Sequence, residues 1–433
     1  MRSKRRGAGL RALAAWGAVL GLALMWAAAP RPALAASQAD LEAKIKMLEQ
    51  SLGELKAQLG QVQTTQQQQQ EAVQVVAAKA AKDSMPKWLE RISLYGDLTL
   101  RYEGWWYDKF KGKETDQRTR WRFRSHFGVK SMVNEDLEVG IRMATAADDD
   151  PTSTVQTMTN WFGEKSWGID RAYAKYNPGY LDKVLTVTAG KFETPFVRTA
   201  IMWDVDVQPE GAYVNLRFNK KGAFQPFLTV AGLVVKEQAS DNPGDAYVYA
   251  PQAGFYYNQD PFKVTFATSY YDWDGFEKVG NFSSTALRGN TAKANGELSD
   301  FGVWDVYAKL TYKIRTDTSV DVFGHWMRNL REDMTGRAAG KDTGYTFAAA
   351  LNWAMWKFQA EYRSIEANAT PGYFGDSEFQ YNNREGWVGR VSYSPFKYTV
   401  INLNWYHSFP IDDYLTGAAA GYDMFQVETT FQF

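Results

Sequence analysis

Arginine recurs at every second position in one short segment of the chain, residues 118–124. In a β-strand successive side chains point to opposite faces, so these arginines would stand in a row on one face and the aromatic residues between them on the other. Such a row can set the ion preference of a water-filled passage, or it can simply solvate the face that carries it. The row consists of Arg118, Arg120, Arg122 and Arg124, and Arg101, Arg142, Arg171 and Arg217 hold the same phase in other alternating segments.

A second charged segment lies between Pro195 and Gly211 and mixes carboxylates with large apolar residues. The apolar residues predict a loop packed inside the protein, with an external loop as the alternative. If it folds inward, its carboxylates would face the arginines across a narrow passage and create a transverse field that orients dipolar solutes. The carboxylates are Asp204, Asp206 and Glu210, and the apolar residues are Phe196, Ile201, Met202, Trp203 and Val207.

Residues suited to catalysis are few. The chain has no cysteine and three histidines, and it lacks the nucleophile, zinc-protease and phosphate-loop motifs. We therefore expect no enzyme, and a barrel enzyme built around His126 is the least favoured alternative; otherwise His126 lines the same face as the arginines. The acidic run Asp148 to Asp150 lacks the spacing of a calcium loop, so we expect no metal and no cofactor.

The alternation that aligns the arginines begins after Pro86 and continues to the last residue. Counting the alternating segments gives about sixteen strands of roughly ten residues each. Short turns such as residues 134–136 alternate with long polar loops such as residues 272–300, and aromatic residues gather near the predicted strand ends. Both features are typical of outer-membrane barrels.

These patterns predict an all-β fold, a transmembrane antiparallel β-barrel over residues 86–433. No apolar run after residue 35 is long enough to form a transmembrane helix, so an exported membrane protein of this sequence must cross as a closed barrel. A very large soluble β-sandwich is the alternative, but it would need a buried face on every strand.

Residues 1–35 have the order of parts of a secretory signal peptide: basic residues, an apolar stretch and Ala33-Leu34-Ala35. We expect cleavage after Ala35, with an uncleaved membrane anchor as the alternative. Residues 1–35 contain six basic and no acidic side chains, so cleavage changes 49 basic against 49 acidic residues into 43 against 49. A mildly acidic mature chain excludes nucleic acid as a partner.

Residues 36–85 predict an α-helical coiled coil in the periplasm. Apolar residues fall at alternating steps of four and three, which forms a heptad seam, and leucine at both seam positions favours more than two strands. A disordered linker is the alternative, because Gly53, Gly60 and the glutamine run 66–70 weaken the helix. The seam residues are Leu41, Ile45, Leu48, Leu52, Leu55, Leu59 and Val62.

The chain ends on alternating apolar residues that include Phe431 and Phe433. This resembles the terminal signature of Gram-negative outer-membrane proteins, which the barrel assembly machinery recognises. The segment from Ala189 to Phe196 resembles the stretch that leads into the inward-folded third loop of trimeric sixteen-stranded porins. The whole chain is similar to those porins that carry an amino-terminal coiled coil and to the phosphate-selective type, although the arginine-rich third-loop motif of a phosphate channel is missing.

The resemblance implies a homotrimer in outer-membrane lipid that lets small hydrophilic solutes or ions diffuse passively through each barrel, with the coiled coil reaching toward peptidoglycan. Two alternatives remain. The first is a solute-specific channel of the anion or phosphate type. The second is a structural tether between outer membrane and cell wall.

Overall fold

A computed structural model describes most of the chain from residue 89 onward. It divides the chain into two units, Met1–Met85 and Pro86–Phe433. The predicted signal peptide and most of the predicted coiled coil lie outside the described residues, so both stay predictions. No helix among the described residues is long and apolar enough to cross a membrane. The described residues are 43, 46–47, 49–54, 56, 89–107, 117–146, 150–159, 161–238, 244–278, 287–415 and 421–433.

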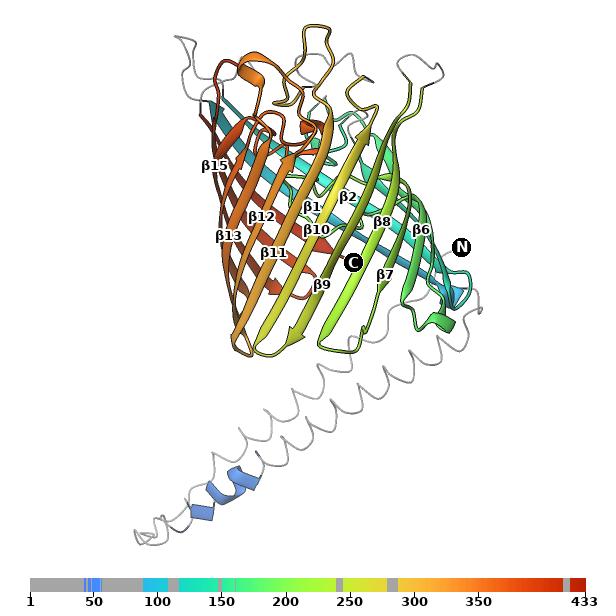
Figure 1. Ribbon diagram of the computed structural model, residues 1–433. Helices are drawn as coiled ribbons and strands as arrows, with labels where there is room; N and C mark the ends of the chain where they lie inside the picture. The colour runs from blue at the N-terminus through green and yellow to red at the C-terminus, as the bar shows by residue number, and fades with distance from the viewer. Residues whose placement is uncertain are drawn as a thin grey trace, which may run out of the picture. The chain divides into compact units, whose positions relative to one another are not determined.

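The second unit is one antiparallel sheet in which, apart from the short β4, each strand pairs with the next one in sequence and the last strand pairs with the first (Figure 1). Seventeen strands form the sheet, but β4 has two residues and only fills the place beside β2 above the end of β3. The remaining sixteen close the barrel, which confirms the predicted antiparallel barrel and its strand number. The strands are β1 (Ile92–Tyr107), β2 (Gln117–Met132), β3 (Leu137–Thr145), β4 (Gln156–Thr157), β5 (Trp167–Tyr176), β6 (Leu185–Lys191), β7 (Glu210–Arg217), β8 (Phe224–Lys236), β9 (Ala246–Gln259), β10 (Phe262–Asp274), β11 (Phe301–Arg315), β12 (Thr318–Asn329), β13 (Thr343–Trp353), β14 (Trp356–Ile365), β15 (Arg384–Phe396), β16 (Thr399–Pro410) and β17 (Tyr422–Gln432).

The two faces of the wall have the polarity expected of a barrel in lipid, and strand β1 illustrates it. Its polar side chains Arg101 and Glu103 are 7% and 0% exposed, whereas Leu98 and Leu100 are 37% and 41% exposed. A soluble sheet does the opposite and buries its apolar face. The inverted pattern places charge on the inner face and apolar side chains on the outer face, which argues against the β-sandwich alternative.

The two ends of the barrel differ in the length of their connections (Figure 1). Tight turns such as residues 316–317 and 354–355 join strands at one end. Long loops such as residues 192–209 and 366–383 join them at the other, and most side chains of these two loops are buried or half-buried. The interior is therefore filled in part by its own loops.

Short 3-10 turns punctuate the connections. They do not interrupt the barrel wall. They are η1 (Leu89–Arg91), η2 (Gly179–Leu181), η3 (Gly336–Ala338) and η4 (Gly372–Phe374).

Candidate functional site

The arginine row on β2 lies on the inner face, as the alternation predicts. Arg120, Arg122 and Arg124 are half-buried, while Trp121 and Phe127 are exposed on the other face. Arg118, near the start of the strand, is exposed. The strand therefore separates guanidinium groups from aromatic rings by the period of two alone.

The arginines of the row do not stand free, because carboxylates from neighbouring strands contact them. The buried Glu103 of β1 bonds Arg120 and lies 3.4 Å from the nearest guanidinium nitrogens of Arg101 and Arg122. Register explains the contacts, since Glu103 pairs with Arg120 and Arg101 pairs with Arg122 across β1 and β2. Arg101 also lies 2.5 Å from Glu428 of β17. The row is thus largely neutralised within the wall.

Toward the other end of β2, ionic contacts link the wall to the interior loops. Arg124 lies 3.4 Å from Asp97 and 3.8 Å from Asp206, and Arg122 donates to the Val155 carbonyl at 2.5 Å. His126 is buried with its Nδ1 2.8 Å from Asp97. Asp206 thus reaches the arginine row itself, so the predicted narrow passage does not separate this carboxylate from Arg124.

A bulge places two charged residues of β5 on the same side of the wall. The pairing of β3 with β5 shifts register between Arg142 and Met143, and Asp170 is the extra residue. Asp170 is buried and accepts a hydrogen bond from Arg142. Arg171 donates to Gln208 at 2.9 Å and lies 2.8 Å from Glu193. A bulge redirects side chains in this way, and alternation alone cannot reveal it.

Arg217 lies at the end of β7, apart from the other arginines. It donates to Gln225 at 2.5 Å and its guanidinium lies 4.5 Å from the centre of the Tyr256 ring. No carboxylate in the described part of the chain pairs with it.

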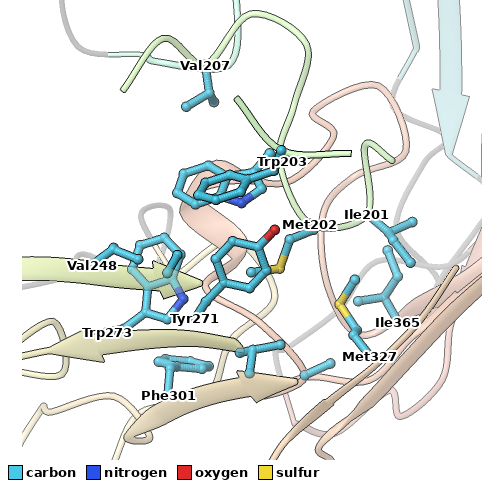
Figure 2. Close-up of a cluster of buried hydrophobic side chains, with 14 of the residues drawn as sticks. Ile201, Met202, Trp203, Val207, Val248, Tyr271, Trp273, Phe301, Met327 and Ile365 are labelled. Carbon is cyan, nitrogen blue, oxygen red and sulfur yellow. The ribbon is translucent and has the colours of Figure 1, made fainter. Parts of the chain in front are cut away.

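The third loop, residues 192–209 between β6 and β7, packs against the inside of the wall at β10, three strands along the sheet from β7. Trp203 stacks on Trp273 of β10 with ring centres 5.1 Å apart, and Phe196 meets Tyr271 edge-on at the same separation. Ile201 is fully buried beside this group (Figure 2). The aromatic contacts hold the loop inside the barrel, because burying large apolar side chains removes their surface from water and so stabilises this position.

The three predicted carboxylates of this loop occupy different places. Asp204 is buried, and its backbone amide donates to the Phe374 carbonyl at 2.8 Å. Asp206 reaches the arginine wall. Glu210 lies outside the loop, because the pairing of β6 with β7 makes it the first residue of β7. Its side chain is exposed and lies 2.9 Å from Lys191. It points to the same face of the strand as the exposed Val214. Glu210 is therefore a strand residue at the base of the predicted loop, and with Asp206 it lines the cavity described below.

A second buried loop, residues 366–383 between β14 and β15, brings two further carboxylates next to Asp204. Oxygens of Asp204, Asp376 and Glu378 lie within 4.8 Å of one another. Burial, together with the neighbouring acids, raises the pKa of Asp204 well above its usual range. Burial also acts on Glu378, but Arg101, 2.9 Å away, outweighs it and lowers the pKa of Glu378 to about 2. Asp204 therefore favours its neutral form.

Arg363, which was not among the predicted site residues, is almost fully buried and anchors the second loop. Arg363 lies 2.6 Å from Glu361 of β14 and 2.5 Å from Asp376. Arg390 of β15 lies 3.3 Å from Glu361. Arg363 has the inward phase of an alternating strand, so its side of the wall was predictable, but its partner across the loop was not.

A histidine on the inner wall tethers the third loop. The Thr199 hydroxyl lies 2.8 Å from Nδ1 of His325, and Nε2 of His325 lies 3.0 Å from Asp305. This hydroxyl, imidazole and carboxylate sequence resembles the order of a catalytic triad. The His325 side chain is completely buried, so the arrangement serves to fix the loop to β11 and β12.

A cavity of about 950 Å³ lies beside the third loop. Trp203 and Phe374 give it an aromatic side, and Asp150, Asp206 and Lys191 give it a charged side. The cavity thus has one apolar and one charged side, and its volume is in the range of pockets that bind small molecules.

The comparisons with known proteins agree with this geometry. The family model described as "Putative porin" matches residues 111–303. The solved structure of Pseudomonas putida OprB has a TM-score of 0.52, with 11% identity over 80% of this chain and 95% of that chain. The resemblance to Gram-negative outer-membrane porins is confirmed. The solved structure of Salmonella typhi OmpF aligns with a TM-score of 0.47, at 14% identity over 79% of this chain and 97% of that chain. No curated protein sequence matches.

Proposed function

We propose that this chain is an outer-membrane porin through which small hydrophilic solutes or ions diffuse passively. The observation that carries the proposal is the inverted wall, with Arg101 and Glu103 buried on the inner face and Leu98 and Leu100 exposed on the outer one. Lipid requires such an outer face, and a closed sixteen-stranded wall is wide enough to enclose an aqueous channel. The porin family match and the barrel fold support an outer-membrane location.

The third loop would set the width of this channel. It crosses the interior to the wall formed by β9 to β12, and Trp203 and Ile201 fix it there. Solutes would then pass the arginines and carboxylates of β1, β2 and the loops, where charge near the narrowest section sets ion preference. The eight wall arginines and the loop carboxylates Asp204 and Asp206 are the residues we propose to line or border the passage.

Further parts of the proposal concern assembly. We propose a homotrimer embedded in outer-membrane lipid, inserted by the barrel assembly machinery through Phe431 and Phe433, with residues 36–85 as a periplasmic coiled coil near peptidoglycan. Phe431 and Phe433 are exposed on the outer face, where a partner can reach them. The mass of the detergent-solubilised complex, measured with and without residues 36–85, tests the trimer and the contribution of the coiled coil.

Single-channel recording in a planar lipid bilayer tests the channel itself. Folded mature protein should produce discrete current steps in potassium chloride. Circular dichroism of the same preparation provides the control for a folded barrel. Folded protein that gives no steps would refute the channel and favour the alternative of a tether between outer membrane and cell wall.

A further inference from the structure

One arginine of the third loop differs from those of the wall. Arg198 is half-buried, yet in the described part of the chain no side chain or backbone group forms an ion pair, a hydrogen bond or a ring contact with its guanidinium. By contrast Arg101, Arg120 and Arg124 each have a carboxylate oxygen within 4.0 Å. The positive charge of Arg198 is therefore not compensated by direct contact.

The loop on either side of Arg198 is fixed to the wall. The Val197 amide donates to the side-chain oxygen of Gln252 at 2.8 Å, and the Gln252 amide donates back to the Val197 carbonyl at 2.9 Å. Thr199 is bonded to His325 at 2.8 Å. Anchors on both neighbours hold the guanidinium near one position, so a solute would meet a preorganised charge.

A second hydrogen-bond donor of this region also lacks an acceptor. Nε of Arg198 and Nε1 of Trp273 are buried and without a hydrogen-bond partner among the described residues, whereas the Tyr271 hydroxyl interacts with Trp203 and Ser269. Figure 2 shows the Tyr271 hydroxyl pointing toward Trp203. Leaving buried donors unsatisfied is unfavourable, so this group calls for an acceptor-rich species.

Neither of the acids near Arg198 forms an ion pair with its guanidinium. Glu193 is exposed and bonded to Arg171. Asp204 does not lie within ion-pair distance of Arg198 and belongs to the carboxylate group it forms with Asp376 and Glu378. Both acids act on the charge of Arg198 from a distance, but neither contacts its guanidinium, so an entering anion would be its first counter-charge in direct contact.

We propose that Arg198 is a specificity-determining residue of the channel and that it selects small anions, above all carboxylates. The planar guanidinium fork matches a carboxylate in geometry as well as in charge. This inference rests on the proposed function, since it requires an open water-filled barrel. It assigns anion preference to the third loop and not to the arginine row.

Reversal potentials of single channels test the inference. Wild-type protein under a potassium chloride gradient should favour chloride. R198Q should lower the chloride-to-potassium permeability ratio roughly 30-fold, because one unit charge about 4 Å from an ion in water changes its energy by about 1 kcal/mol, with opposite sign for the two ions. R198K should keep the preference for anions but lose discrimination in favour of acetate over chloride, because an ammonium lacks the fork. R328Q is the matched control, since Arg328 is an exposed arginine on the outer phase of β12, paired with Asp342, and its ratio should equal that of wild type.

A wild-type ratio in R198Q would overturn the inference while leaving the porin intact. Loss of current steps in both R198Q and R198K, with R328Q conducting, would mean that Arg198 serves folding, and this also overturns it. A wild-type protein that is folded and silent refutes the channel itself. The two failures are therefore distinguishable.

Discussion

Replacing Glu378 by Gln should destabilise the barrel in a pH-dependent way. The carboxylate lies 2.9 Å from Arg101 and its pKa falls from 4.5 to about 2. A depressed pKa means that the folded state holds the ionised form more strongly than the unfolded state does. The shift of about 2.5 units corresponds to about 3 kcal/mol of unfolding free energy at pH 7.

The sign of the pH dependence follows from the same shift. The stabilisation by Glu378 is fully present above pH 4.5 and is lost as the pH falls toward 2. The difference between wild type and E378Q should therefore shrink to about 1 kcal/mol at pH 3. Urea unfolding of detergent-folded protein, followed by circular dichroism at both pH values, measures it. E135Q, in an exposed turn, is the control and should match wild type. A difference that is equal at both pH values, or absent at pH 7, would refute the ion-pair argument.

Three further changes probe the third loop and the first residues of β7. Trp203→Ala should lower the unfolding free energy by about 3–5 kcal/mol in urea unfolding, because it removes a buried ring that stacks on Trp273. Gly211→Ala should also destabilise the barrel in that assay, since Gly211 has a φ of 136° and a Cβ there would collide with the Gly232 carbonyl. Asp204→Asn should stabilise the protein at neutral pH and have no effect at acid pH, because the raised pKa of Asp204 makes its charged form unfavourable in the fold; equal effects at both pH values would contradict it.

The alternation of the sequence was sufficient to predict the wall, because the period of two decides which face each side chain takes. It placed Arg120 inside and Trp121 outside. It could not predict Arg101 against Glu378, since that contact joins residues 277 positions apart and depends on how a loop folds back into the barrel. The position of Glu210 in a strand was not predicted for a related reason. The pairing of β6 with β7 reaches as far as Lys191 and Glu210, which lies inside the stretch predicted as loop.

Closure of the barrel also explains why a row of arginines can lie half-buried on one wall. Like charges opposite each other on neighbouring strands are destabilising, and register does place Arg101 opposite Arg122. On its other side, however, Arg101 is opposite Glu428 of β17, and Glu103 is opposite Arg120. Glu103 and Glu428 both point to the inner face of their strands. The neutralisation of the arginine charges therefore follows from the sequence once β1 is known to pair with β17.

This pairing changes how a mutation in the row should be interpreted. The guanidinium groups of Arg101, Arg120 and Arg122 contact the carboxylates of Glu103, Glu378 and Glu428, three positive charges against three negative ones. Removing Arg120 or Arg122 would leave Glu103 undercompensated and would shift ion preference toward cations even if neither arginine attracts anions in the intact protein. A shift in such a variant therefore reports a newly unpaired carboxylate. Arg198 is the better probe, because removing an arginine without a contacting acid leaves no such charge behind.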